Sequence, residues 1–132
     1  MIVSVPRENV FDEKRVALLP EAVTRLKKLE GATVLVESGL GEDLGFDDAA
    51  YRDAGALVTS LKNDLFASDI VLRIHKPQKD EVALIKEGGA YISFLDPFNE
   101  AELIDALAER GVTAVSMEMV PRTTRALSLI HI

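Results

Sequence analysis

Short apolar runs alternate along the chain with segments in which apolar residues recur every three or four positions. The runs are rich in Val and Ile and end at Pro, Gly or charged residues, a pattern typical of strands in a parallel sheet. The intervening segments each carry one apolar stripe, which is typical of amphipathic helices. The predicted strands are residues 2–5, 33–37, 56–58, 70–74, 90–94 and 112–116. The predicted helices are residues 20–30, 48–54, 61–66, 81–86 and 100–110.

Local capping signals support four of the predicted helix starts. Asp47, Ser60 and Asp80 each stand directly before a predicted helix and are expected to cap it through a side-chain oxygen. Asn99 is followed three residues later by Glu102, which resembles a capping box. Each of these starts is therefore expected to be set by a local side-chain contact.

The alternation of strands and helices predicts the fold class. Repeated strand–helix–strand units favour an α/β fold with a mostly parallel, doubly wound sheet of Rossmann or flavodoxin type, and with helices on both faces. In such folds the ligand crevice lies beyond the carboxyl ends of the strands. Position along the chain therefore predicts which residues line that crevice.

Basic side chains gather around the predicted crevice. They are Arg7, Arg15, His75, Lys76, Arg122 and Arg125. On a chain whose net charge is −7, such a cluster favours an anionic ligand.

The composition narrows the classes of function. Of the 132 residues, 48% are hydrophobic and 28% are charged, which is typical of a globular domain. The acidic balance disfavours nucleic acid as a partner, because nucleic-acid binding needs a basic face. The absence of cysteine excludes disulfides and thiolate chemistry, and two histidines far apart in the sequence predict no metal site. No apolar run approaches the roughly 18 residues that a membrane span needs.

Three glycines follow the second predicted strand, in Glu-Ser-Gly-Leu-Gly-Glu-Asp-Leu-Gly-Phe. The spacing of Gly39, Gly41 and Gly45 is GxGxxxG rather than the GxGxxG of a dinucleotide-binding loop. Glu42 and Asp43 lie inside the segment and would repel a pyrophosphate. A plain turn is therefore the favoured interpretation.

Two basic side chains admit both a functional and a structural interpretation. His75 lies one residue beyond a predicted buried strand, where an imidazole could act as an acid or base; the alternative is a solvated loop histidine. Arg15 could direct its guanidinium at a carboxylate or phosphate; the alternative is a surface arginine paired with Asp12 or Glu13. The residues alone leave both questions open.

Several segments, taken in order, carry a resemblance to a known family. They are Val-Pro-Arg-Glu, Glu-Lys-Arg-Val-Ala-Leu-Leu-Pro, Val-Glu-Ser-Gly-Leu-Gly, Phe-Asp-Asp-Ala-Ala-Tyr, Asp-Ala-Gly-Ala, Ala-Ser-Asp-Ile-Val-Leu-Arg-Ile and Met-Glu-Met-Val-Pro-Arg-Thr-Thr-Arg-Ala. Together they resemble the N-terminal domain shared by alanine dehydrogenase and the alpha subunit of proton-translocating NAD(P) transhydrogenase. The resemblance covers residues 1–126, which are expected to form this domain. Residues 127–132 depart from the family pattern and are interpreted as an atypical tail from a truncation or a change of reading frame.

The resemblance also distinguishes two branches of the family. Alanine dehydrogenases carry a substrate-binding lysine at the position of His75 and a catalytic histidine at the position of Asp96, so both of these groups are absent here. Val-Pro-Arg-Thr-Thr-Arg-Ala resembles the transhydrogenase segment that leads into a loop contacting NAD(H). By this resemblance Arg125 is the cofactor-binding arginine, and Arg15 matches an arginine that binds the substrate carboxylate in alanine dehydrogenase. The further residues expected to line the crevice are Arg7, Arg15, His75 and Arg122, and no catalytic residue is assigned.

For the intact protein, the resemblance implies hydride transfer between NAD(H) and NADP(H), with NADP(H) on a partner subunit and with coupling to proton translocation by membrane-embedded subunits. It also implies a homodimer of the alpha subunit, located in the cytoplasm and peripheral to the inner membrane through its partners. This chain alone is expected to be inactive, because it lacks a GxGxxG unit. The alternatives are a divergent alanine-dehydrogenase-type oxidoreductase domain and a noncatalytic binding or assembly module.

Overall fold

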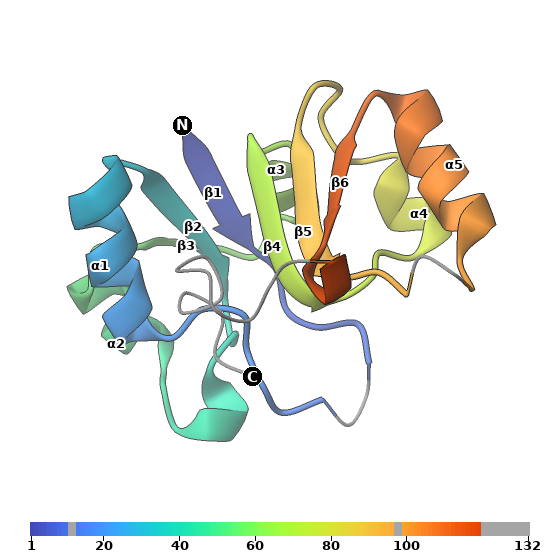
Figure 1. Ribbon diagram of the computed structural model, residues 1–132. Coiled ribbons are helices and arrows are strands. Elements are labelled where there is room, and N and C mark those ends of the chain that lie inside the picture. Colours follow the sequence, from blue (N-terminus) through green and yellow to red (C-terminus); the bar gives the residue numbers. More distant parts are fainter. Residues whose placement is uncertain (11–12, 97–98, 120–132) are drawn as a thin grey trace.

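One parallel sheet forms the centre of the molecule (Figure 1). The structure is a computed structural model that describes residues 1–10, 13–96 and 99–119. Within these residues the sheet has six strands in the order β3-β2-β1-β4-β5-β6, and every neighbouring pair is parallel. The strands are β1 (Ile2–Val5), β2 (Thr33–Glu37), β3 (Leu57–Thr59), β4 (Ile70–His75), β5 (Ala90–Phe94) and β6 (Thr113–Ser116). The strand order reverses between β1 and β4, which makes that junction the switch point of a doubly wound sheet.

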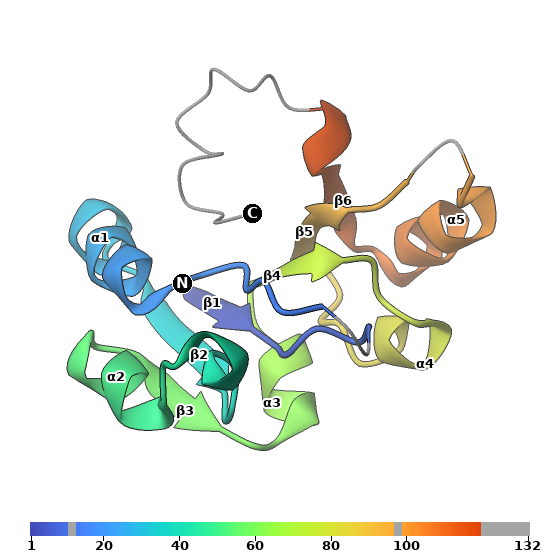
Figure 2. The ribbon, with the colours of Figure 1, turned by 90° about the horizontal axis from the view of Figure 1, so that it is seen from below.

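Helices connect the strands and lie on both faces of the sheet (Figure 2). They are α1 (Pro20–Glu30), α2 (Asp48–Asp53), α3 (Lys62–Phe66), α4 (Lys79–Val82) and α5 (Ala101–Arg110), with the short 3-10 helices η1 (Glu42–Leu44) and η2 (Met117–Met119). α1 and α2 cover one face, and α3, α4 and α5 cover the other. The predicted fold class is therefore confirmed. No helix in the described part of the chain combines the length and the apolar character that a bilayer crossing requires.

A separate apolar core lies on each face of the sheet. Under α1 and α2, the side chains of Val23 and Tyr51 are completely buried. Under α3, α4 and α5, the same is true of Phe66, Ile85 and Leu107. Burial of each such side chain contributes about 1.5–3 kcal/mol. The two cores fix the strands from both sides and so bring their carboxyl ends to one edge of the sheet.

Several predicted boundaries are confirmed. β1, β2 and β5 begin and end at the predicted residues, and so does α1, which begins at Pro20. α1 ends at Gly31, whose left-handed φ of 62° suits glycine. Asp47 caps α2 as predicted, because its Oδ1 accepts a hydrogen bond from the backbone N–H of Ala50 at 2.9 Å.

Three predicted caps are wrong. α3 is preceded by Leu61 rather than Ser60, and no side chain caps it. α4 starts earlier than predicted, with Gln78 rather than Asp80 as its N-cap. α5 has Glu100 rather than Asn99 at its N-cap, again without a side-chain cap. A capping residue read from sequence is a local preference. At α4 the contacts of Glu81 with Arg73 and with the N–H of Gln78 override it.

His75 is also placed differently from the prediction. It is the last residue of β4 rather than the first residue of a loop, and its side chain is half-buried. The strand reaches His75 because this residue pairs with Phe94 of β5. A carboxylate from another segment binds the backbone N–H groups of Ile74 and His75.

Candidate functional site

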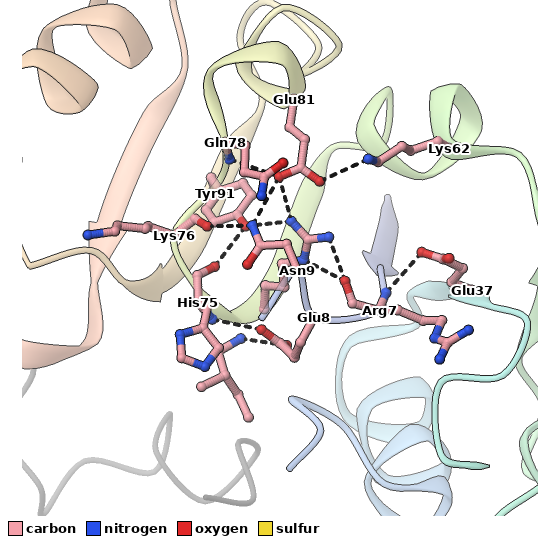
Figure 3. Close-up of polar contacts among 12 residues, drawn as sticks. Arg7, Glu8, Asn9, Glu37, Lys62, His75, Lys76, Gln78, Glu81 and Tyr91 are labelled. Atoms are coloured by element: carbon pink, nitrogen blue, oxygen red, sulfur yellow. Dashed lines mark hydrogen bonds and ion pairs between the residues drawn. The ribbon is translucent and has the colours of Figure 1, made fainter. Parts of the chain in front are cut away.

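The crevice at the switch point is filled by the chain itself (Figure 3). Glu8 follows β1 and directs its carboxylate across to the end of β4. Its two oxygens accept hydrogen bonds from the backbone N–H groups of Ile74 and His75 at 2.9 and 2.8 Å. Burial raises the pKa of Glu8, and the two N–H groups oppose that rise. The place where doubly wound folds usually bind a ligand is thus occupied by an internal carboxylate.

A buried arginine holds the loop that carries Glu8. Arg73 lies in β4 and is 2% exposed. Its Nε and Nη2 donate to the backbone carbonyl of Arg7, the Nε at 2.8 Å. Its guanidinium also lies 5.3 Å from the centre of the Phe66 ring, within the range of a cation–π contact. Arg73 therefore ties the turn after β1 to the body of the sheet.

Glu81 is the buried counter-ion of Arg73. Its Oε1 lies 2.9 Å from Arg73 Nη1 and also accepts hydrogen bonds from the Asn9 amide at 3.2 Å and the Gln78 N–H at 2.8 Å. Its Oε2 lies 3.2 Å from Lys62 Nζ. Burial raises the pKa of Glu81, but Arg73, the Gln78 N–H and the Asn9 amide together lower it to about 2. Figure 3 shows these groups converging under the crevice from β4, α4 and the turn after β1.

Two hollows flank this turn, and Asn9 and Val10 line both of them. The larger has a volume of about 500 Å³ and carries three cationic side chains, Arg7, Lys14 and Arg15. The smaller has a volume of about 430 Å³ and lies toward α4 and α5; His75 and Lys76 line it. The predicted crevice is therefore divided into two parts by the segment after β1.

One carboxylate joins Arg15 to His75. Oε2 of Glu13 accepts a hydrogen bond from Arg15 Nε at 2.9 Å, and Oε1 of Glu13 accepts one from Arg15 Nη2 at 2.6 Å. The same Oε1 lies 2.7 Å from Nε2 of His75. The bidentate contact with Arg15 is the main cause of a Glu13 pKa of about 2. The alternative in which Arg15 pairs with Glu13 is thus confirmed, and the alternative of a simply solvated His75 is wrong.

The predicted crevice residues have different outcomes. Arg7 and Arg15 line the larger hollow. His75 and Lys76 line the smaller one, where Lys76 Nζ pairs with Glu100 Oε1 at 2.5 Å. The basic cluster was taken to favour an anionic ligand, but two of its members are paired within the chain, Arg15 with Glu13 and Lys76 with Glu100. Arg122 and Arg125 lie outside the described residues.

The glycine segment after β2 is a turn, as predicted. The N–H of Gly39 donates to the Asp48 carboxylate at 2.8 Å, so it is not directed at a ligand. Gly41 packs so tightly that an added Cβ would lie 2.8 Å from the Phe46 side chain and 2.9 Å from the Tyr51 ring. Gly45, with a φ of 83°, ends η1. These glycines serve the packing of the turn, and the segment does not fit a pyrophosphate.

The sequence analysis assigned no role to Glu8, Arg73 or Glu81. One signal was available, because Arg73 interrupts an otherwise apolar strand that was predicted to be buried. A charged residue at such a position needs a partner. The Gln78–Glu81 spacing is the second signal, since it forms the capping box of α4.

Comparison with known proteins gives a consistent picture. The model of the family described as "Alanine dehydrogenase/PNT, N-terminal domain" matches residues 4–131. The NAD(P) transhydrogenase subunit alpha of Cereibacter sphaeroides is 40% identical over 127 residues, covering 96% of this chain and 24% of the relative.

Solved structures agree with the family match. A transhydrogenase from Sinorhizobium meliloti superposes with a TM-score of 0.88 at 37% identity, covering 97% of this chain and 38% of that one. An L-alanine dehydrogenase superposes with a TM-score of 0.85 at 30% identity, covering 94% and 35%. The chain spans about a quarter of the length of the first curated relatives that it matches. The chain belongs to the alanine dehydrogenase/PNT N-terminal domain family, and its matches place it with the N-terminal domain of transhydrogenase alpha subunits.

Proposed function

We propose that this chain is the N-terminal part of the NAD(H)-binding alpha subunit of a transhydrogenase. In the intact protein, hydride would pass between NAD(H) and NADP(H), with NADP(H) on a partner subunit. Membrane-embedded subunits would couple this transfer to proton translocation. The alpha subunit would form a homodimer in the cytoplasm, peripheral to the inner membrane through those partners. Support comes from the likeness to alpha subunits over nearly the whole chain.

The observation that carries the choice of branch is the pair of residues at the ends of β4 and β5. The resemblance implies that an amino-acid dehydrogenase would have lysine and histidine at these positions, where this chain has His75 and Asp96. Asp96 adopts a left-handed φ of 51°. Its carboxylate accepts hydrogen bonds from the Asn99 amide, and its N–H donates to Glu118 at 3.0 Å. Asp96 is thus bonded within the turn after β5, at the position where the resemblance implies a histidine in alanine dehydrogenases.

The role proposed for this chain is to form one wall of the NAD(H) cleft. Arg125 would contact the nucleotide, as the resemblance implies, and Arg7, Arg15 and Arg122 would line the crevice. The glycine turn after β2 does not fit a pyrophosphate, so within the described residues no loop cradles the nucleotide phosphates. The phosphates are therefore assigned to a further domain of the intact protein.

A second candidate is a divergent alanine-dehydrogenase-type oxidoreductase. It is supported by Glu13, which brings Arg15 and His75 together on one carboxylate. Arg15 would then bind a substrate carboxylate and His75 would exchange a proton with the substrate. A noncatalytic binding or assembly module is the remaining alternative.

Activity assays on the intact protein with its partner subunits separate these functions. The proposal predicts NADH-dependent reduction of an NADP⁺ analogue and no NADH oxidation with pyruvate and ammonia. The reverse pattern would establish the second candidate, and inactivity in both assays together with no NADH binding would favour the noncatalytic module.

The 132-residue chain alone is expected to show neither hydride transfer nor tight NADH binding. The reason is that it carries no GxGxxG unit and that its glycine turn is internally bonded. Calorimetric titration with NADH is the measurement. A dissociation constant at or below about 10 μM would contradict this expectation, because it requires about 7 kcal/mol of binding free energy from the described wall and the arginine segment alone.

A further inference from the structure

Two successive backbone N–H groups at the end of β4 bind the same carboxylate (Figure 3). The N–H of Ile74 donates to one oxygen of Glu8 at 2.9 Å, and the N–H of His75 donates to the other at 2.8 Å. In a regular strand, successive N–H groups point to opposite edges of the strand. The pairing of β4 with β5 shifts its register between Leu72 and His75, and this irregularity lets both groups reach Glu8. The end of β4 thus presents two donors to one carboxylate.

The turn that carries Glu8 is anchored on both sides of that residue. Arg73 donates from Nε and Nη2 to the carbonyl of Arg7, and the side-chain amide of Asn9 donates to the carbonyl of Lys76 at 3.0 Å. A guanidinium and an amide do not change their protonation near neutral pH. Among the described contacts of residues 7–9 with the end of β4, the carboxylate of Glu8 is therefore the one that a proton can break.

A proton on Glu8 removes one of its two hydrogen bonds. An ionised carboxylate has two accepting oxygens, whereas a carboxylic acid carries a donor on one of them. That donor would face a backbone N–H, which is also a donor, so only one of the two N–H groups would keep its partner. A glutamine at position 8 has the same mismatch, because its NH₂ group donates.

Charged and titratable groups surround Glu8 from several elements. Arg73 and His75 come from β4 and Tyr91 from β5, and Arg7 is the neighbour of Glu8 in its own turn. The larger hollow, which Glu8 also lines, adds Glu13, Lys14, Arg15 and Asp43. Burial raises the pKa of Glu8, although the two N–H groups and the charges of Arg73 and His75 oppose the rise. Glu8 therefore takes up a proton at a higher pH than an exposed glutamate does.

We propose that Glu8 is a proton-operated latch on the end of β4, closed while its carboxylate binds both N–H groups and open once a proton removes one of these bonds. Glu8 is a positioning residue, because it acts on the crevice through the backbone of Ile74 and His75. When the latch opens, the ring of His75 keeps its contact with Glu13, but the end of β4 loses one of its two fixed points. The inference does not depend on the proposed function.

Amide NMR of this chain as a function of pH tests the latch. The N–H signals of Ile74 and His75 are expected to titrate together, with a midpoint above the roughly 4.3 of an unperturbed glutamate. Their protection from hydrogen exchange, corrected for its intrinsic pH dependence, should fall about tenfold across this transition, as the loss of one hydrogen bond implies. The N–H of Gly39 is the internal reference. It donates to Asp48 at 2.8 Å, and this bond lowers the pKa of Asp48, so its signal should change only at more acidic pH.

The Glu8→Gln variant is expected to reproduce the open latch at neutral pH. Its two reporter amides should show the lower protection and no titration. Glu37→Gln is the matched control, because Glu37 binds the N–H of Arg7 at 3.0 Å from the end of β2. This variant should leave the amides of Ile74 and His75 as they are in the parent chain. The amides of β1 and β2 report whether a variant loses stability as a whole.

Three results would overturn the proposal. The first is a midpoint at or below that of an ordinary glutamate, and the second is a transition that persists in Glu8→Gln. The third is a loss of protection in Glu8→Gln that is equally large throughout β1 and β2, since that would be a general loss of stability. Any of these failures leaves the proposed function standing, because no nucleotide takes part in the measurements.

Discussion

The buried Arg73–Glu81 pair permits a quantitative prediction about stability. In the Glu81→Leu variant, Arg73 keeps its charge but loses its counter-ion in a site where its side chain is 3% exposed. In Arg73→Met, the carboxylate of Glu81 is left with the Asn9 amide, the Gln78 N–H and Lys62. Both single variants therefore leave one buried charge without its main partner.

The measured cost of breaking buried ion pairs gives the magnitude. Removal of one partner from a buried ion pair costs about 3–5 kcal/mol. The lowered pKa of Glu81 agrees in direction, because Arg73 is the main group that favours its ionised form against the effect of burial. Each single variant is therefore expected to lose about 3 kcal/mol or more of unfolding free energy. This is a large part of the roughly 5–15 kcal/mol of a typical domain.

The double variant Arg73→Met/Glu81→Leu is the decisive comparison. The double variant removes both charges and fills the site with apolar side chains. Its loss of unfolding free energy is therefore expected to be smaller than that of either single variant. Urea unfolding followed by circular dichroism measures all three against the parent chain. The reasoning is refuted if each single variant loses less than about 1 kcal/mol, or if the double variant loses the sum of the two. A double variant that folds where the singles do not supports it.

The remaining predictions concern acid and packing. The pKa of Glu13 and that of Glu81 both fall to about 2 in the folded chain. The stability that each ionised group contributes is therefore complete above about pH 4.5 and is lost as the pH drops toward 2. Urea unfolding midpoints across this pH range should fall less steeply in Glu81→Gln than in the parent chain. The Gly41→Ala variant should lose about 1–3 kcal/mol of unfolding free energy, because the new Cβ would clash with the Phe46 side chain and the Tyr51 ring. The Gly31→Ala variant has open space around its new Cβ, so it should lose only about 1 kcal/mol of unfolding free energy, from the left-handed φ at this position. Equal losses of unfolding free energy in the two variants would argue against close packing at Gly41.

Much of the fold could be predicted because its signals are local and repeated. Apolar runs gave β1, β2 and β5 their bounds, and Pro20 and Gly31 bracket α1 as their backbone preferences require. Single capping residues were less reliable. Asp80 was predicted to cap a helix. Glu81 beside it instead pairs with Arg73 and accepts a hydrogen bond from the N–H of Gln78, so the helix starts earlier, with Gln78 as its N-cap.

The site could be predicted only in outline. The rule for the carboxyl ends of strands pointed to Arg7 and His75, and Arg15 was considered as a side chain that could reach from the rim. In the structure all three line the two hollows. Their partners could not be derived in the same way. The contact between Glu8 and His75 spans 67 residues, and that between Glu13 and His75 spans 62.

The sequence by itself determined the alternation of strands and helices, the family, and the set of charged residues near the strand ends. The alternation and the set of charged residues follow from periodicity and from the residues placed after each apolar run, and the family follows from the resemblance of the ordered motifs. Only the tertiary structure decided how those charges are used: Glu8 fills the switch point, Glu13 joins Arg15 to His75, and Arg73 and Glu81 neutralise each other in the interior. The physical reason is that a charge must find a partner where it is buried, and the choice of partner depends on which distant segments the sheet brings together.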